Sequence, residues 1–534
     1  MKAPQESGLD RAQEDLLARL DAVVSQHEAS NTAADAAFRS FLRRYYETAA
    51  TESLTQRDDA ALVATARRHW QLAQQRGAEQ FCLRITPPAP GSALATLETV
   101  VADQPFLVDS LSLAIRAAGA SIDWSVHPVL RLARRPDGTL VGLAERDDEP
   151  GSAVESLIHL EFEALPSSEA YARLEADCRT VLADVKRVVD DYPAALARVR
   201  NLIDSLQTVP AGANAADFDE ARAFLDYLHD HHFTFFGVIE SLAERGDDGR
   251  TRFRTDDASG LGLLRVGSDW AAQELIAPVA ELDKYADSTR VVVVTKANLR
   301  STIHRAELLD AVSVKRFGPD GQLAGTVRLI GLFSSEVYID RPRHIPLIRR
   351  KAEYVMTRSR LAENSHSGKN LRDILHTLPR DELFQSNEEE LFRLCMGIRS
   401  LRDRHGLRLF MRRDRYGRFY SFLVYLPRER YSRELRDKVG STLLTLCGGT
   451  SLDRTVEFLR GDLTRVQFIV RTAPGTQLSL TAGEIERVLF VATRTWRDQL
   501  RDLLRDDATR AARFADAFPL SYAEVASPAE AAAD

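Results

Sequence analysis

Apolar residues recur three and four positions apart along the first 76 residues of the chain. The segments LLARLDAVV, FRSFLRRYYETA and ALVATARRHWQLAQQR follow this spacing, which is typical of helices that bury one face. Alanine and charged residues fill the positions between. We therefore predict a helical arm over residues 1–76 that packs on a neighbouring unit.

From Phe81 the pattern changes to short apolar runs separated by turns. FCLRITPP and ALATLETVVAD predict strands, and PFLVDSLSLAIRAAGA predicts a helix with Pro105 in its first turn. Further strands and a long helix from about Ser167 to Asp190 give an order close to a ferredoxin-like unit over 81–190. We expect the apolar residues of the first helix to divide between its start and its sheet-facing side: Phe106, Leu107, Val108, Leu111 and Ile115.

A second α+β region, ACT-like or related, is predicted over 219–340. The segment DFDEARAFLDYLHDHH predicts a helix that Asp219 caps, and strands follow, ending in the hairpin VSVKRFGPDGQLAGTVRLIGLF. Its Pro-Asp-Gly turn supplies the preset and positive φ angles that a tight turn needs. Helical spacing then returns over 341–404, which predicts a helical connector.

The third unit, over 407–505, opens with a second hairpin, LRLFMRRDRYGRFYSFLVYLPRERY. Leu423 and Tyr425 should share one face of its second strand, opposite Val424. The strands and helices that follow repeat the rhythm of 81–190. We therefore predict a multi-domain α+β fold in which two ferredoxin-like, ACT-like βαβ units are separated by helical segments, with a tail over 506–534 whose end, SPAEAAAD, has no structure.

Composition narrows the class of protein. The chain has 534 residues, 44% hydrophobic and 28% charged, with a net charge of −7, so no global field attracts nucleic acid or membranes. Its apolar runs are shorter than the ~20 residues that span a bilayer. The early acids exclude a secretory signal. The scattered cysteines lie in apolar patterns, typical of buried thiols in a reducing compartment. These cysteines are Cys82, Cys178, Cys395 and Cys447. We therefore expect a cytoplasmic protein.

Candidate catalytic and metal-binding motifs are weak. The cluster His229, His231 and His232 lacks a second group of ligands, so a helix-end cap is favoured over a metal site. GLGLLRVG and CGGT lack the spacing of nucleotide-binding loops. No Gly-x-Ser-x-Gly motif is present.

Two basic segments allow more than one interpretation. The stretch Lys296–Tyr338 is dense in Lys, Arg, Ser, Thr and His, but strand alternation would separate Ser301 from Thr302 and His304 from Arg305. The second hairpin interleaves arginines with aromatic residues, a composition found both in single-strand nucleic-acid binders and in domain interfaces. Its residues are Arg412, Arg413, Arg415, Tyr416, Arg418, Phe419 and Tyr420.

Several long phrases resemble the N-terminal region of the large bacterial NAD-dependent glutamate dehydrogenases. In chain order they are DQPFLVDSLSLAIRAAG with HPVLRL, FLDYLHDHHFTFFG, VVTKANLRSTIHR with VSVKRFGPDGQLAGTVRLIGLFSS, and LRLFMRRDRYGRFYSFLVYLPRERYSRELR. The resemblance runs from about residue 30 to about residue 525. It implies ACT-like modules and helical segments that precede a dehydrogenase domain.

The family oxidatively deaminates L-glutamate to 2-oxoglutarate and ammonia, and NAD accepts the hydride. This sequence has no Gly-x-Gly-x-x-Gly after a strand. We therefore expect no catalytic residue, cofactor site or metal in it, and expect a regulatory and oligomerisation region, its dehydrogenase domain lost by truncation or encoded separately. Its partners would be that domain, sister subunits of a homo-oligomer and a small amino-acid effector, with no nucleic acid or membrane. The alternative is a stand-alone amino-acid-sensing or scaffold protein built from ACT-like modules.

ACT-like modules often bind an amino acid where the first strand leads into the first helix, which is VADQPFLVDSL in this chain. Asp103 would take the amino group, with Asp109 and Ser110 lining the same mouth, while backbone amides of the first helical turn meet the carboxylate. The competing interpretation is that Asp103 caps the helix.

Overall fold

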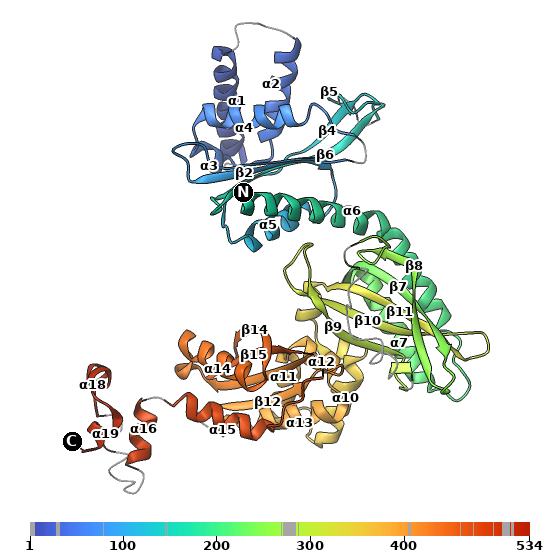
Figure 1. Ribbon diagram of the computed structural model, residues 1–534, viewed down its shortest axis with the longest axis vertical. Helices are drawn as coiled ribbons and strands as arrows, with labels where there is room; N and C mark the ends of the chain where they lie inside the picture. Colours follow the sequence, from blue (N-terminus) through green and yellow to red (C-terminus); the bar gives the residue numbers. More distant parts are fainter. Residues whose placement is uncertain are drawn as a thin grey trace.

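Helices cover both faces of the first of three antiparallel sheets (Figure 1). The computed structural model describes residues 6–27, 33–77, 80–144, 146, 148–268, 270, 285–286, 288–403, 407–459, 461–473, 475–494, 496–504, 513 and 517–533. The first sheet contains β1 (Cys82–Thr86), β2 (Leu94–Ala102), β3 (Ile122–Val126), β4 (Val129–Arg134), β5 (Leu140–Leu143) and β6 (Ser152–Glu163). The helices on one face are α1 (Glu6–His27), α2 (Ala33–Tyr46), α3 (Thr51–Thr55) and α4 (Asp59–Leu72). On the other face lie α5 (Leu107–Ala117) and α6 (Ser168–Ser205).

The strand order of this sheet is β1-β2-β6, followed by β3 and β4 end to end along β6. Pro128 separates β3 from β4, because proline has no N–H to give to the ladder. In a ferredoxin-like unit the fourth strand follows the second helix and lies beside the first. Here that edge is occupied by β1, which comes before β2 in the chain and not after the second helix. The order is therefore a permuted ferredoxin-like one.

The apolar residues of α5 divide as predicted. Leu107, Leu111 and Ile115 are buried in the core shared with α6, whereas Phe106 and Val108 are partly buried at its edge. The prediction that Pro105 lies in the first turn of the helix was wrong. The helix begins after Phe106, whose φ of 73° is left-handed.

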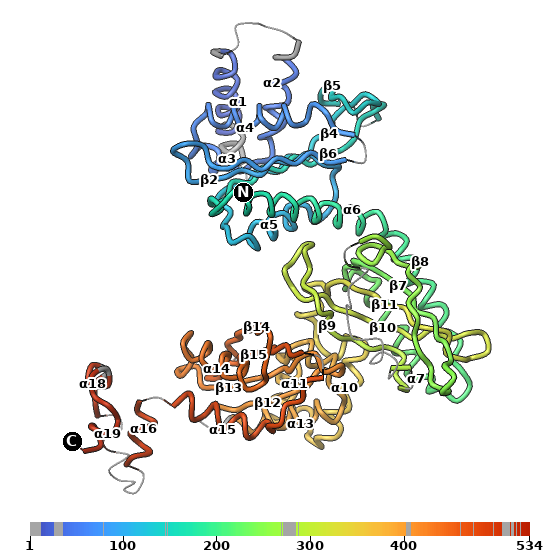
Figure 2. The backbone as a smooth tube through the Cα atoms, viewed as in Figure 1, coloured from blue at the N-terminus to red at the C-terminus, as the bar shows by residue number. Residues whose placement is uncertain are grey.

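The prediction that the long helix ends near Asp190 was wrong, because α6 is 38 residues long and ends at Ser205. Its first half packs on the first sheet through Leu174 and Val181, and its last turns pack on the second unit through Val199 and Ile203. Pro193 lies inside the helix. Figure 2 shows α6 running from beneath the first sheet into the second unit.

The second unit begins with α7 (Ala215–Tyr227), which Asn214 caps through its side chain, and not Asp219 as predicted. Its sheet has the order β8-β7-β11-β10-β9, so it is not a further copy of the ferredoxin-like units. The predicted hairpin is present, since β10 and β11 pair throughout. The strands are β7 (Phe233–Arg245), β8 (Thr251–Gly262), β9 (Val292–Arg300), β10 (Leu308–Phe317) and β11 (Leu323–Phe333).

Short helices cover the outer face of the second sheet, in agreement with the helical spacing over 341–404. They bury Phe384, Leu391 and Cys395 against Phe235 and Val294 of the sheet. They are α9 (Ser335–Ile339), α10 (Ile348–Ser359), α11 (His366–Thr377), α12 (Arg380–Gln385) and α13 (Glu388–Arg399).

The third sheet repeats the permuted order of the first. Its strand order is β12-β13-β15-β14. β12 occupies the edge that the fourth strand takes in a ferredoxin-like unit. Leu423 and Tyr425 face the helical connector and Val424 faces the opposite core, as predicted. The elements are β12 (Arg408–Arg413), β13 (Phe419–Pro427), α14 (Arg433–Leu446), β14 (Gly449–Phe458), β15 (Leu463–Thr472) and α15 (Ala482–Ala492).

The C-terminal segment differs from its prediction in two ways. The apolar spacing of TAGEIERVLFVATRTWRDQLRDLL would allow one continuous helix, but the segment forms two, α15 and α16 (Trp496–Leu503), and Pro528–Ala533 of the predicted unstructured end is helical. α18 (Leu520–Val525) and α19 (Pro528–Ala533) follow, and Ala531 is buried against Leu500 of α16. Of the helices described, none is both long and apolar enough to cross a membrane.

Candidate functional site

The turn between β2 and α5 holds the predicted ligand residues, but they engage two different sets of partners. Asp103 is exposed, and its carboxylate accepts a 2.6 Å hydrogen bond from Ser156 Oγ. The same hydroxyl lies 2.9 Å from His127 Nε2. Burial lowers the pKa of His127, although the nearby Asp103 opposes this shift. Asp103 does not cap α5, because no side chain caps the N-terminus of this helix.

Asp109 and Ser110 contact the loop between β9 and β10 of the second unit. Ser110 Oγ donates to the carbonyl of Phe106 at 2.6 Å and accepts from the backbone N–H of His304 at 3.1 Å. Asp109 Oδ2 lies 3.0 Å from His304 Nδ1. The rings of Phe106 and His304 are 5.1 Å apart. These side chains join the first unit to the second, and a role as amino-acid ligands stays a prediction.

The segment from Ser301 to Arg305 is a loop, so the prediction that strand alternation separates its side chains was wrong. His304 has a left-handed φ of 64°. Ser301 Oγ donates to the carbonyl of Ile303, and Arg305 donates to the carbonyl of Phe333. Ser301 and Arg305 thus bind backbone carbonyls, and the described contacts form no nucleophile–base pair.

Lys296, the first residue of the basic stretch, is buried. Its ammonium is 2.8 Å from Asp310 on β10 and 3.4 Å from Asp381 on α12. Burial alone would lower the pKa of Lys296, but these two carboxylates raise it above its ordinary value. A permanently charged lysine held between two acids is typical of a structural ion pair. The stretch therefore joins the second sheet to the helical connector.

The basic hairpin is a domain interface. Arg418 is buried, pairs with Asp414, and donates to Lys296 O at 2.7 Å and to Thr295 Oγ1 at 2.6 Å. The aromatic side chains that a single strand would stack on are buried: Tyr416, Phe419 and Tyr420. The interface interpretation of these residues is thereby favoured over nucleic-acid binding.

The histidine cluster ends a helix, as expected. His232 Nδ1 lies 3.0 Å from the carbonyl of Tyr227, and its ring stacks on the Tyr227 ring at 3.8 Å. His229 lies 3.4 Å from Arg200, and His231 has a left-handed φ of 60°. Across the described ranges, no three His, Cys, Asp or Glu side chains are grouped so as to hold a metal ion.

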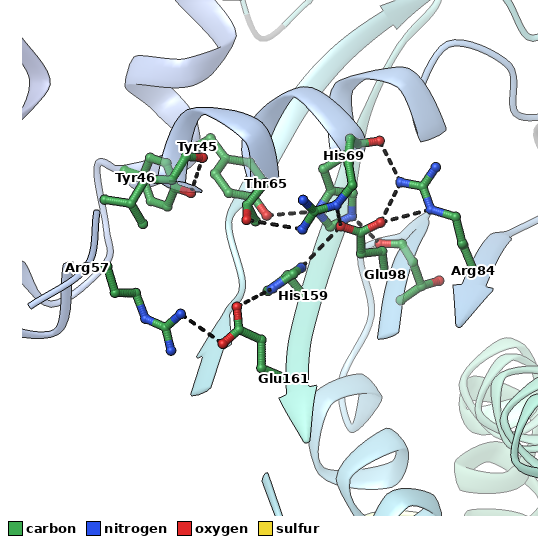
Figure 3. Close-up of polar contacts among 12 residues, drawn as sticks. Tyr45, Tyr46, Arg57, Thr65, His69, Arg84, Glu98, His159 and Glu161 are labelled. Atoms are coloured by element: carbon green, nitrogen blue, oxygen red, sulfur yellow. Dashed lines mark hydrogen bonds and ion pairs between the residues drawn. The ribbon is translucent and has the colours of Figure 1, made fainter. Parts of the chain in front are cut away.

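A buried ionic network lies between the N-terminal helices and the first sheet (Figure 3). Glu98 on β2 accepts from Arg68 at 3.2 Å and from Arg84, and lies 3.3 Å from His159 on β6. His159 also lies 3.4 Å from Glu161, which pairs with Arg57 at 2.8 Å. The sequence analysis did not predict this network. Its signal in the sequence is a pair of polar residues, Glu98 and His159, within apolar strands.

The network fixes the charge of its members. Burial alone would raise the pKa of Glu98, but His159, His69 and the two arginines lower it to about 2. Burial lowers the pKa of His69 to about 4, so this imidazole is neutral and bridges Tyr45 and the carbonyl of Thr99. His159 differs, because Glu161 and Glu98 overcome its burial and raise its pKa. The network thus holds the helices on the sheet by charge as well as by packing.

Glu98→Gln should destabilise the fold by roughly 3 kcal/mol, because it leaves the buried His159 and the partly exposed Arg68 and Arg84 without their buried carboxylate partner. The stability due to Glu98 is present above its unfolded pKa of 4.5 and is lost as the pH falls towards about 2. Urea unfolding at several pH values should therefore show a smaller loss at pH 3 than at pH 7. Glu175→Gln, at an exposed pair on α6, is the matched control. Equal effects of the two variants would contradict this account.

Three family models match the chain in the order of its units. They are the glutamate dehydrogenase ACT1 domain at residues 41–178, helical motif 1 at 345–404 and the ACT2 domain at 408–497. The two ACT matches contain the two permuted ferredoxin-like sheets, and the helical motif contains α10 to α13.

Curated relatives agree with these matches. The chain is 32% identical to the NAD-specific glutamate dehydrogenase of Halomonas elongata over 91% of its own length, and 31% identical to that of Pseudomonas aeruginosa over 92%. The protein of the same name from Mycobacterium tuberculosis is 25% identical over 87%. The chain spans only 31% of the length of the first two relatives. It belongs to the family of large NAD-dependent glutamate dehydrogenases.

Proposed function

We propose that residues 1–534 are the regulatory and oligomerisation region of a large NAD-dependent glutamate dehydrogenase. In this proposal the oxidative deamination of L-glutamate, with NAD as hydride acceptor, is carried out by residues outside this chain. The observation that carries the proposal is the succession of ACT1, helical motif 1 and ACT2 matches, in a chain that spans 31% of the length of named NAD-specific enzymes.

The side-chain contacts favour a structural role in joining the units over a catalytic role. The charged residues singled out in the basic stretch and the basic hairpin join one unit to the next, as Lys296 and Arg418 do. We propose that the partners of the region are its own dehydrogenase domain and sister subunits of a homo-oligomer in the cytoplasm. Units that share apolar cores, as the first and second units do through α6, are suited to holding catalytic domains at set separations.

Purified residues 1–534 should produce no NADH when incubated with L-glutamate and NAD, because the proposal assigns the chemistry elsewhere. NADH fluorescence measures this directly, and the full-length Pseudomonas aeruginosa relative serves as the positive control. Turnover by this chain alone would contradict the proposal that the catalytic residues lie outside it.

An amino-acid effector is proposed at the turn between β2 and α5. Asp103 is exposed there and its second carboxylate oxygen has no hydrogen bond among the described residues, so it is placed to accept from an ammonium group. Asp109 and Ser110 already bond to His304. Asp103 is therefore the residue on which the test depends.

Asp103→Ala should weaken the binding of an activating or inhibiting amino acid by about 10-fold, the loss expected for one charge-assisted hydrogen bond. Calorimetric titration with a panel of amino acids measures this. Asp177→Ala, at an exposed position of α6, should leave binding unchanged. Unaltered binding in Asp103→Ala would exclude this turn, and a lower melting temperature with unaltered binding would assign Asp103 to the Ser156 hydrogen bond alone.

The alternative, a stand-alone amino-acid-sensing or scaffold protein, predicts the same effector binding. Only the neighbouring DNA separates the two: a dehydrogenase-coding segment downstream favours the first, and an unrelated gene favours the second.

A further inference from the structure

A polar cavity of about 630 Å³ lies where the second unit, the helical connector and the third unit meet. Its wall is formed by α7, by β9, by the start of α10, by the junction of α12 with α13, and by the hairpin between β12 and β13. The basic hairpin contributes Arg412, Arg413 and Arg415 to it, but the other lining residues come from distant parts of the chain and belong to no motif. Its cationic lining is Arg290, Arg350, Lys351, Arg412, Arg413 and Arg415.

Most acids of the lining are already committed to other groups. Asp217 pairs with Arg350 at 2.5 Å, Glu220 with Arg349 at 2.7 Å, and Asp414 with Arg418 at 2.7 Å. Glu390 accepts from the backbone N–H of Asn387 in the capping box of α13. Among the described lining residues, this leaves Glu388 as the acid without such a bond.

The cations are not neutralised to the same extent. Arg412 pairs with Glu382, and Lys351 donates to the carbonyls of Leu383, Phe384 and Ser386. Within the part of the chain that the structure describes, Arg290 and Arg415 have no acidic partner at ion-pair distance, and Arg413 reaches only the carbonyl of Thr476. Three guanidinium groups thus face two glutamates, Glu388 and Glu390, because a backbone hydrogen bond leaves the charge of Glu390 in place.

These positive charges repel one another. Burial lowers the pKa of Arg290 and the charge of Arg415 lowers it further, while Glu388 and Glu390 oppose this shift. Burial likewise lowers the pKa of Lys351 to about 7. Arg290, Arg415 and Arg412 add to this shift, and Glu388 opposes it. An anion in the cavity would relieve this repulsion, since opposite charges at close range favour the protonated cations.

A neutral group points to a ligand independently. Gln385 lines the cavity, and its Oε1 is buried without a hydrogen-bond partner among the described residues. A buried acceptor left unpaired costs about 1–3 kcal/mol. A hydroxyl or ammonium donor on a bound molecule would satisfy it.

We propose that this cavity is an effector site for a small organic anion with at least two negative charges, held through carboxylate or phosphate groups by Arg290 and Arg415. The guanidinium fork matches both groups bidentately, and the volume lies within the ~300–1,000 Å³ of ordinary ligand pockets. Because three units form its wall, an occupant would also fix their relative placement. Binding to this chain requires no dehydrogenase domain, so its failure would leave the function proposed above intact.

The test is calorimetric titration of residues 1–534 at constant ionic strength with succinate and citrate in one arm and with phosphate and pyrophosphate in the other. At least one polyvalent anion should bind saturably, whereas acetate and chloride should not. The arm that binds identifies the anionic group. Arg290→Gln/Arg415→Gln should weaken binding at least about 10-fold, equivalent to one charge-assisted hydrogen bond or more.

Two controls keep the outcome decisive. Arg135→Gln/Arg245→Gln removes the same charge from exposed positions away from the cavity and should bind as the unaltered chain does. Arg415→Gln alone changes an exposed residue, so it tests the site if the double variant fails to fold. Absence of saturable binding by every polyvalent anion, or equal losses in the cavity and control variants, would overturn the proposal.

Discussion

The need to cover both faces of the second sheet organises the rest of this molecule. Neighbouring residues of β7 point to opposite sides, so Phe236 packs with the first unit and α6, while Phe235 packs with the helical connector. Burying each such aromatic side chain contributes about 1.5–3 kcal/mol. A sheet that is apolar on both faces cannot stand alone in water, and each flanking unit therefore has a fixed place against it.

The permuted order of the two ferredoxin-like sheets makes this arrangement possible. In the first unit the edge strand beside β2 comes from upstream, as β1. α6 therefore need not return to the sheet to supply a last strand. It continues for 38 residues and gives its later turns to the core of the second unit. One helix shared by two cores is stiffer than a loop of the same reach.

Buried charged side chains mark the junctions within and between units. Glu98 joins the N-terminal helices to the first sheet, Lys296 joins the second sheet to α12, and Arg418 joins the third unit to the second. Burying charges costs free energy that their pairing largely repays, so such contacts stabilise less than they specify geometry. We infer that their role is to set how one unit sits on the next.

The sequence by itself determined the local elements and the family. Period-2 and period-3.6 patterns predicted the hairpins over 308–333 and 408–427 and the faces of Leu423 and Tyr425, because burial alternates along a strand. Only the tertiary structure decided where charged side chains converge. Arg290 and Arg415 are 125 residues apart by their numbers and carry no local motif, and Asp109 meets His304 across two units. Such contacts depend on how whole units pack, and a periodicity within one element does not contain that information.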